Sequence, residues 1–182
     1  MILRYELQIQ TMIKAMIDTV LPAVDPRNGL AQEQAQLIIG TLRLMAEQLP
    51  LQYRFDCDDL TRAVSFAEEL SAALDSCPGP IAETVSALTS SAARGRRLLT
   101  GPLVDPAEII TTARDIRTAL DHAVDAVFTD DSVRNQREDI RQIVLDQSRD
   151  EITRDRVWNR AQGFDTESQY LPSIESLLVP AA

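Results

Sequence analysis

The sequence predicts an all-α protein, an antiparallel bundle of about six amphipathic helices with an apolar C-terminal tail. Only six glycines and nine prolines occur in 182 residues, which is too little turn chemistry for a protein with many strands. Apolar residues make up 45% of the chain but aromatic residues only 4%, so aliphatic side chains have to fill the core. The stretches between prolines and glycines are rich in alanine, leucine, glutamine, glutamate and arginine, which favour helices.

Four helices are predicted in the first hundred residues, each about 20 residues long and each ended by proline or glycine. The first covers residues 3–21, where apolar residues recur at steps of three and four positions. The second covers residues 30–49, and a proline follows it. The third begins near Asp56 and stops in the CPGP stretch at 77–80, and the fourth starts at Pro80.

The fifth helix has the clearest start. Asp105 is an N-cap acceptor, Pro106 suits the first helical position, and Glu108 supplies a carboxylate in the first turn. The helix is expected to run to about Phe128 with a buried stripe of Ile109, Ala113, Ile116, Leu120, Val124 and Val127. A sixth helix follows and is predicted to continue to about Ala161.

The sixth helix differs from the others in its charge. Residues 130–162 contain eight acidic and seven basic residues, a mixture typical of a solvated helix. Its apolar stripe includes Val144 and Trp158, but Gln147 and Glu151 interrupt that stripe. Two interpretations stay open: a helix exposed to solvent on the bundle, or a helix that projects from it.

The predicted domain organisation is a helical bundle over residues 1–162 and a tail over residues 163–182. The tail is too apolar to remain in water, so it is expected to cover its own bundle or another subunit. If the protein is an oligomer, the tail and the end of the sixth helix should form the contact. The predicted interface residues are Trp158, Tyr170, Leu171, Ile174 and Leu178.

Scarce residue types exclude several chemistries. His122 is the single histidine, which excludes a twin Glu-x-x-His di-iron bundle, a histidine-rich zinc site and an HExxH protease within one chain. Lys14 is the single lysine and Ala15 follows it, so there is no P-loop. GxGxxG and GxSxG motifs are also absent. No cofactor and no metal ion is expected.

Acidic pairs come closest to a metal motif. The aspartates at 58–59 and at 130–131 are each followed by an arginine where the DDxxD pattern needs a third carboxylate for Mg²⁺. Asp56 and the pair at 58–59 are instead predicted to cap the third helix, because carboxylates favour helix N-termini.

One acid–base constellation is present on the fifth helix. Asp115, His122 and Asp125 fall along one side, at spacings that could hold an imidazole between carboxylates. However, His122 lies roughly 150° around the helix from the centre of the apolar stripe. It is therefore expected to face water or a partner, and a catalytic role is the least favoured interpretation.

Three arginines, Arg94, Arg96 and Arg97, gather at the end of the fourth helix. Guanidinium groups bind phosphate or carboxylate ligands in a bidentate manner, so these residues are candidate ligand-binding groups. Their interaction with the carbonyl end of the helix is a sufficient explanation for their position.

The net charge of −10 argues against binding to nucleic acid or to anionic membrane surfaces. Cys57 and Cys77 form no CxxC motif and are expected to be free thiols, and the aspartates near Cys57 argue against a reactive thiolate. No signal-like start and no run of about 18 apolar residues occurs. A soluble, cytoplasmic, bacterial protein without membrane insertion is expected.

Three functions are compatible with these observations. The favoured one is a non-enzymatic helical protein that self-associates or binds a protein partner. A dimer is the favoured form of self-association. The second is a bundle that binds a small apolar or lipid-like ligand, because aliphatic helices can part around a cavity of at least ~300 Å³. The third, an enzyme that uses His122 with Asp115 or Asp125, rests on spacing alone.

Overall fold

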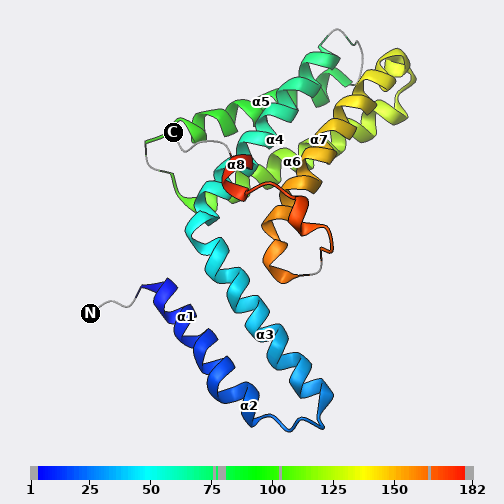
Figure 1. Cartoon of the computed structure of the whole chain (residues 1–182). Helices are drawn as coiled ribbons and strands as arrows, with labels where there is room; N and C mark the ends of the chain where they lie inside the picture. The colour runs from blue at the N-terminus through cyan, green and yellow to red at the C-terminus, as the bar shows by residue number, and fades with distance from the viewer. Residues whose placement is uncertain (1–3, 76, 78–80, 103, 164, 179–182) are drawn as a thin grey trace. The chain divides into compact units, whose positions relative to one another are not determined.

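The computed structural model describes residues 4–75, 77, 81–102, 104–163 and 165–178, and in these residues it contains helices and no strand (Figure 1). The prediction of an all-α helical bundle is confirmed. Contacts group the chain into two compact units. We call Met1–Gln52 with Thr153–Leu177 the hairpin unit, and Tyr53–Ile152 with Leu178–Ala182 the core unit. The expected division into 1–162 and 163–182 stays a prediction.

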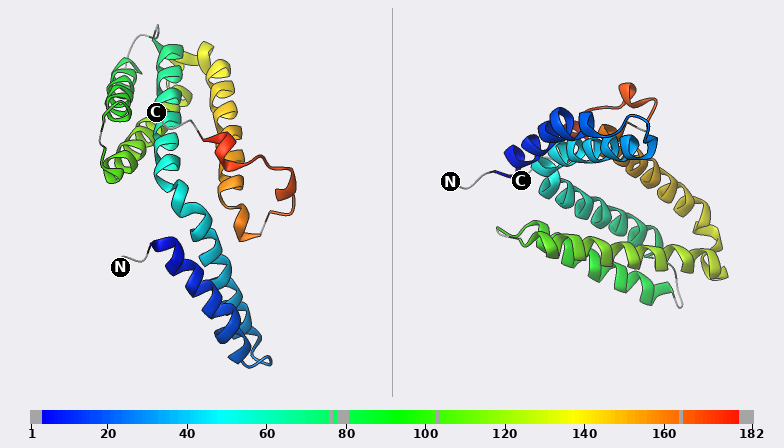
Figure 2. Two further views of the ribbon diagram at one scale, coloured as in Figure 1. Left: turned by 60° about the vertical axis from the view of Figure 1, so that its left-hand side comes forward. Right: turned by 90° about the horizontal axis from the view of Figure 1, so that it is seen from below.

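The hairpin unit begins with two long helical segments that lie side by side (Figures 1 and 2). Helix α1 (Tyr5–Ala15) continues through a π-helical turn (Met16–Val20) into α2 (Leu21–Ala23). Helix α3 (Gly29–Gln48) runs back along α1. Asn28 caps α3, because its side-chain oxygen accepts a hydrogen bond of 3.1 Å from a backbone N–H in the first turn.

The rest of the hairpin unit comes from the C-terminal part of the chain. Helix α7 (Arg137–Trp158) ends in this unit and is followed by 3₁₀ turns at Arg160–Gln162 and Ser168–Tyr170 and by the short α8 (Ile174–Leu177). The turn after α7 closes at Gly163, whose φ of 77° is a conformation that glycine adopts without strain. The Arg160–Gln162 turn packs on α3.

Among the described residues, the core unit contains most of α4 (Gln52–Leu74), α5 (Ile81–Leu99), α6 (Pro106–Thr129) and the first part of α7. A 3₁₀ segment at Asp131–Gln136 joins α6 to α7. The predicted start of α6 is confirmed, because the Asp105 side chain accepts a hydrogen bond of 2.8 Å from the N–H of Ala107. The stripe predicted for α6 is buried at Ile109, Ala113, Ile116, Leu120 and Val127, and Val124 is partly buried.

Helix α5 packs closely against α4 and α6 at Gly95. A Cβ atom built at Gly95 would lie 2.6 Å from Cγ2 of Val64 and 2.9 Å from Cδ1 of Ile116. Both distances are shorter than the contacts of 3.5 to 4.0 Å that are favourable between carbon atoms. The absence of a side chain at Gly95 therefore sets the spacing between these helices.

The start of α4 differs from the prediction. The helix begins at Gln52, directly after a 3₁₀ turn at Leu49–Leu51 that contains Pro50, and not near Asp56. Proline is compatible with such a first turn, where its missing N–H needs no partner. Asp56 and the aspartates at 58–59 consequently lie inside α4, so the prediction that they cap this helix is wrong.

Candidate interaction surfaces

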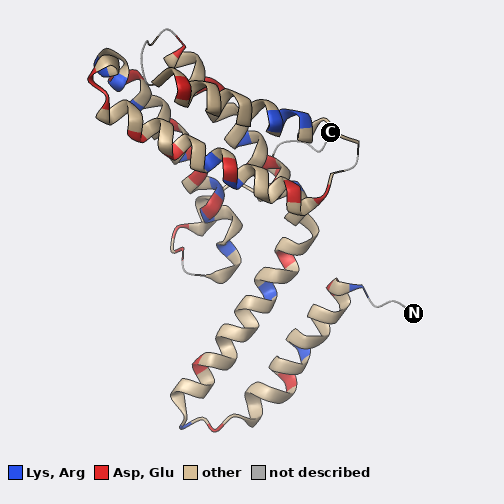
Figure 3. Cartoon of the chain, turned by 180° about the vertical axis from the view of Figure 1, so that it is seen from behind, with Lys and Arg blue, Asp and Glu red and all other residues tan. Residues whose placement is uncertain are grey.

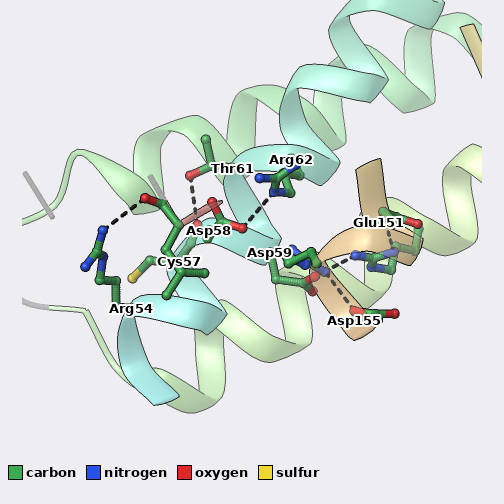
Figure 4. A network of polar contacts seen from close by, with 11 residues as sticks. Arg54, Cys57, Asp58, Asp59, Thr61, Arg62, Glu151 and Asp155 are labelled. Carbon is green, nitrogen blue, oxygen red and sulfur yellow. Dashed lines mark hydrogen bonds and ion pairs between the residues drawn. The ribbon is translucent and has the colours of Figure 1, made fainter. Parts of the chain in front are cut away.

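An ion pair with a buried carboxylate lies on α4 in the core unit. The Nε atom of Arg62 donates a hydrogen bond of 2.7 Å to Oδ2 of Asp58, one helical turn earlier on α4 (Figure 4). The Asp58 side chain is fully buried, whereas the side chain of Arg62 is about one-fifth exposed. A buried carboxylate needs such a partner, because the loss of hydration is otherwise uncompensated.

A second ion-pair network joins three helices of the core unit. Arg117 on α6 donates hydrogen bonds of 2.6 Å to Asp59 on α4 and 3.0 Å to Glu151 on α7. Burial disfavours the charge on Arg117, but the two carboxylates outweigh this effect and raise the pKa of the guanidinium. This contact explains why Glu151 interrupts the apolar stripe of α7: its carboxylate is needed opposite Arg117.

A cleft of about 560 Å³ opens beside this network in the core unit. Its wall is largely apolar, with Phe66, Leu120, Val124, Phe128 and Val144, and its charged groups are Arg117, Asp121, Asp125 and Glu151. Ser148 carries the one hydroxyl among the described lining residues, and it donates a hydrogen bond of 2.7 Å to the carbonyl of Val144. No histidine is among the described residues that line this cleft, so the candidate bases in the lining are the carboxylates of Asp121, Asp125 and Glu151.

The three residues of the acid–base constellation predicted on α6 lie in different surroundings. His122 is exposed, as its position around the helix predicted, and it is not among the described residues that line the cleft. Asp115 forms an ion pair with Arg94 on α5. It is seven residues from His122, about 10 Å along the helix axis. Asp125 lines the cleft. The structure therefore shows no direct contact among the three residues within the described hydrogen bonds and ion pairs.

Two of the three arginines at the end of α5 bind carboxylates on neighbouring helices. Arg94 pairs with Asp115, and Arg96 binds Glu68 in a bidentate manner, with 2.8 Å between Nε of Arg96 and Oε1 of Glu68. The hydrogen bond and charge of Glu68 raise the pKa of Arg96. Arg97 is exposed. A ligand anion would have to compete with these internal carboxylates for Arg94 and Arg96.

Burial is the main influence on the pKa of the Cys57 thiol. Burial raises the pKa of Cys57, and the charge of Asp56 raises it further against the opposing hydrogen bond from Tyr53. Cys77 is a buried free thiol. Among the described residues, no three histidine, cysteine, aspartate or glutamate side chains gather as they would around a metal ion.

The hairpin unit has an apolar groove at the end where α1 begins and α3 ends. The groove has a volume of about 410 Å³ and is lined by Tyr5, Gln8, Ile9, Met12, Met45, Gln48, Leu49 and Gln52. Tyr5 is 73% exposed and Met45 is 48% exposed. None of the described residues that line the groove is charged, so the groove fits an apolar surface.

The apolar surface continues along α3 beyond the groove. Ile38 is one heptad before Met45, so the two side chains point to the same side of the helix, and both are about half exposed. We call the exposed set Tyr5, Met12, Ile38, Met45 and Leu49 the hairpin face. Figure 3 shows how few charged residues α1 and α3 carry. Only nine of residues 1–52 are charged, four basic and five acidic.

The interface residues predicted in the C-terminal part occupy different positions. Trp158 is partly buried in the hairpin unit, and its carbonyl accepts a hydrogen bond of 3.0 Å from Nε2 of Gln48. Tyr170 is 80% exposed, and Leu171 and Ile174 are partly buried. Leu178 is buried, and its carbonyl accepts a hydrogen bond of 3.0 Å from Arg54 in the core unit.

The hairpin face was not identified from the sequence, where residues 3–21 and 30–49 were predicted as two helices of the bundle. The low charge of this region was the available signal. A surface helix normally carries charged residues on the side that faces water. A region with nine charges in 52 residues cannot cover all of its exposed surface in this way.

Comparisons with protein-family models, with curated proteins and with solved structures gave no match for this chain. Among the described helices, we find none that combines the length and the hydropathy required to cross a membrane.

Proposed function

We propose that this is a non-enzymatic protein that binds a protein surface through the hairpin face. The observation that carries the proposal is the exposure of large apolar side chains from both α1 and α3 on one side of the hairpin, around a groove of about 410 Å³. Contiguous apolar patches of this kind mark interaction sites on soluble proteins, whereas single exposed apolar residues do not.

The character of the hairpin face supports a protein partner. Methionine and aromatic residues are enriched at the centre of protein interfaces and charged residues are depleted there. The hairpin face has two methionines and a tyrosine, and glutamines are, with Tyr5, the polar residues among those described around the groove. Free thiols at Cys57 and Cys77 support a cytoplasmic location.

Photo-crosslinking in cells tests this proposal. A photoreactive phenylalanine analogue at Met45 should form covalent adducts with protein, because a partner surface covers this position. The matched control carries the analogue at Leu37, which is on the same helix and 44% exposed but lies about 100° around α3 from the hairpin face. Equal adduct formation at both positions, or no protein adduct at Met45, would refute docking through this face.

A small apolar ligand is the second candidate for the same groove. Its volume of about 410 Å³ exceeds the ~300 Å³ that a small-molecule site requires. Native mass spectrometry of the purified protein should then show a bound species of a few hundred daltons that the change Met45→Glu removes. An unliganded mass for protein purified without detergent contradicts this second function.

A further inference from the structure

We infer that the partner of the hairpin face is a second copy of this chain, and that two hairpins pack face to face as an antiparallel four-helix contact. This inference rests on the proposed function, because it names the partner for the same face. The hairpin offers two neighbouring helices that expose large apolar side chains along a shared side, as each half of a four-helix bundle does. A two-fold axis would give each copy the same contact.

The spacing of apolar residues on α3 suits helix-to-helix packing. Ile38, Leu42, Met45 and Leu49 follow the steps of four, three and four residues that form the seam of packed helices. Leu42 is partly buried, and the other three are exposed by about half. In a symmetric antiparallel pair of α3 helices, Ile38 of one copy would lie opposite Leu49 of the other, and Leu42 would lie opposite Met45.

The charges of the chain favour this partner over a basic protein. The core-unit residues 53–152 contain 19 acidic and 11 basic side chains, so a basic partner would be attracted there. Residues 1–52 have a net charge of −1, so two hairpins repel each other weakly despite the net charge of −10 for the chain. The α3 charges Glu33, Arg43 and Glu47 lie roughly 140° to 180° around the helix from the hairpin face.

The available area is sufficient for a stable dimer. Helix α3 has 20 residues, which corresponds to a length of about 30 Å. Two helices side by side are about 20 Å wide, so each hairpin presents roughly 600 Å². Two copies would bury about 1,200 Å² in total, which reaches the lower end of the range for specific protein interfaces.

Sedimentation of the purified full chain tests the inference. We expect a monomer–dimer equilibrium in the micromolar range, and we expect Met45→Glu to raise the dissociation constant at least 100-fold, because it buries a charge at the centre of the contact. The control Leu37→Glu introduces the same charge on the same helix at similar exposure and should change the dissociation constant less than threefold. Circular dichroism should show an unchanged helix content for both variants.

Two results would refute the inference that the partner is a second copy of this chain. One is a wild-type protein that stays monomeric up to 100 μM. The other is a dimer that Met45→Glu and Leu37→Glu weaken equally. If the wild type is monomeric but the analogue at Met45 still forms adducts with a different protein in cells, only the identity of the partner is wrong. If the adducts are also absent, the proposed function fails as well.

Discussion

The close approach of three helices at Gly95 predicts that two glycine-to-alanine changes have opposite effects. In Gly95→Ala the new methyl group overlaps Cγ2 of Val64 by about 1 Å, and the buried valine cannot move freely. Overpacking of this kind costs about 1–3 kcal/mol, and the higher helix propensity of alanine offsets about 1 kcal/mol. We therefore expect the free energy of unfolding of the core unit to fall by about 1 kcal/mol.

The matched change is Gly40→Ala in α3, where a Cβ atom would meet no other atom within 4 Å. This change should raise the stability of the hairpin unit by about 0.5–1 kcal/mol, because only the propensity term remains. Urea unfolding followed by circular dichroism reports both units, and fluorescence of Trp158, the single tryptophan, reports the hairpin unit. A stabilising effect of Gly95→Ala equal to that of Gly40→Ala would refute the close packing of α5 on α4 and α6.

Two further predictions concern ion pairs. Asp58→Ala should lower the free energy of unfolding by about 2–3 kcal/mol, because it leaves the guanidinium of Arg62 partly buried without this carboxylate. The double variant Asp58→Ala/Arg62→Met should recover part of this loss, and urea unfolding measures both variants. Hydrogen bonds from Arg156 and from the backbone hold the pKa of Asp165 below its ordinary value of 3.8. The carboxylate therefore stabilises the fold above pH 3.8, and this contribution disappears as the pH falls through the lower pKa of the folded state. Trp158 fluorescence should show a larger acid-induced loss of stability for the wild type than for Asp165→Asn, and equal losses would contradict the assignment.

Local signals in the sequence predicted several elements correctly. Helix α6 was predicted within about one residue, because Asp105 and Pro106 define its start and its stripe has an unbroken helical period. The start of α4 was missed by about four residues, since a proline can end one helix or occupy the first turn of the next.

Contacts between residues far apart in the sequence could not be predicted in the same way. Glu151 appeared only as an interruption in an apolar stripe, because its partner Arg117 is 34 residues away and belongs to another helix. The hairpin face was missed for a related reason. Periodicity shows that a helix has an apolar side, but it does not show whether this side meets another helix of the chain or remains exposed.

The most direct measurement of the central claim is the identity of the molecule that crosslinks to position 45 in cells. Intact mass and peptide mapping of the adduct identify both the partner and the contacting segment. We expect a protein adduct with twice the mass of one chain, joined to a peptide from α1 or α3 of the second copy. An adduct with lipid or another small molecule alone, or with a peptide from the core unit, would contradict protein docking between hairpin faces.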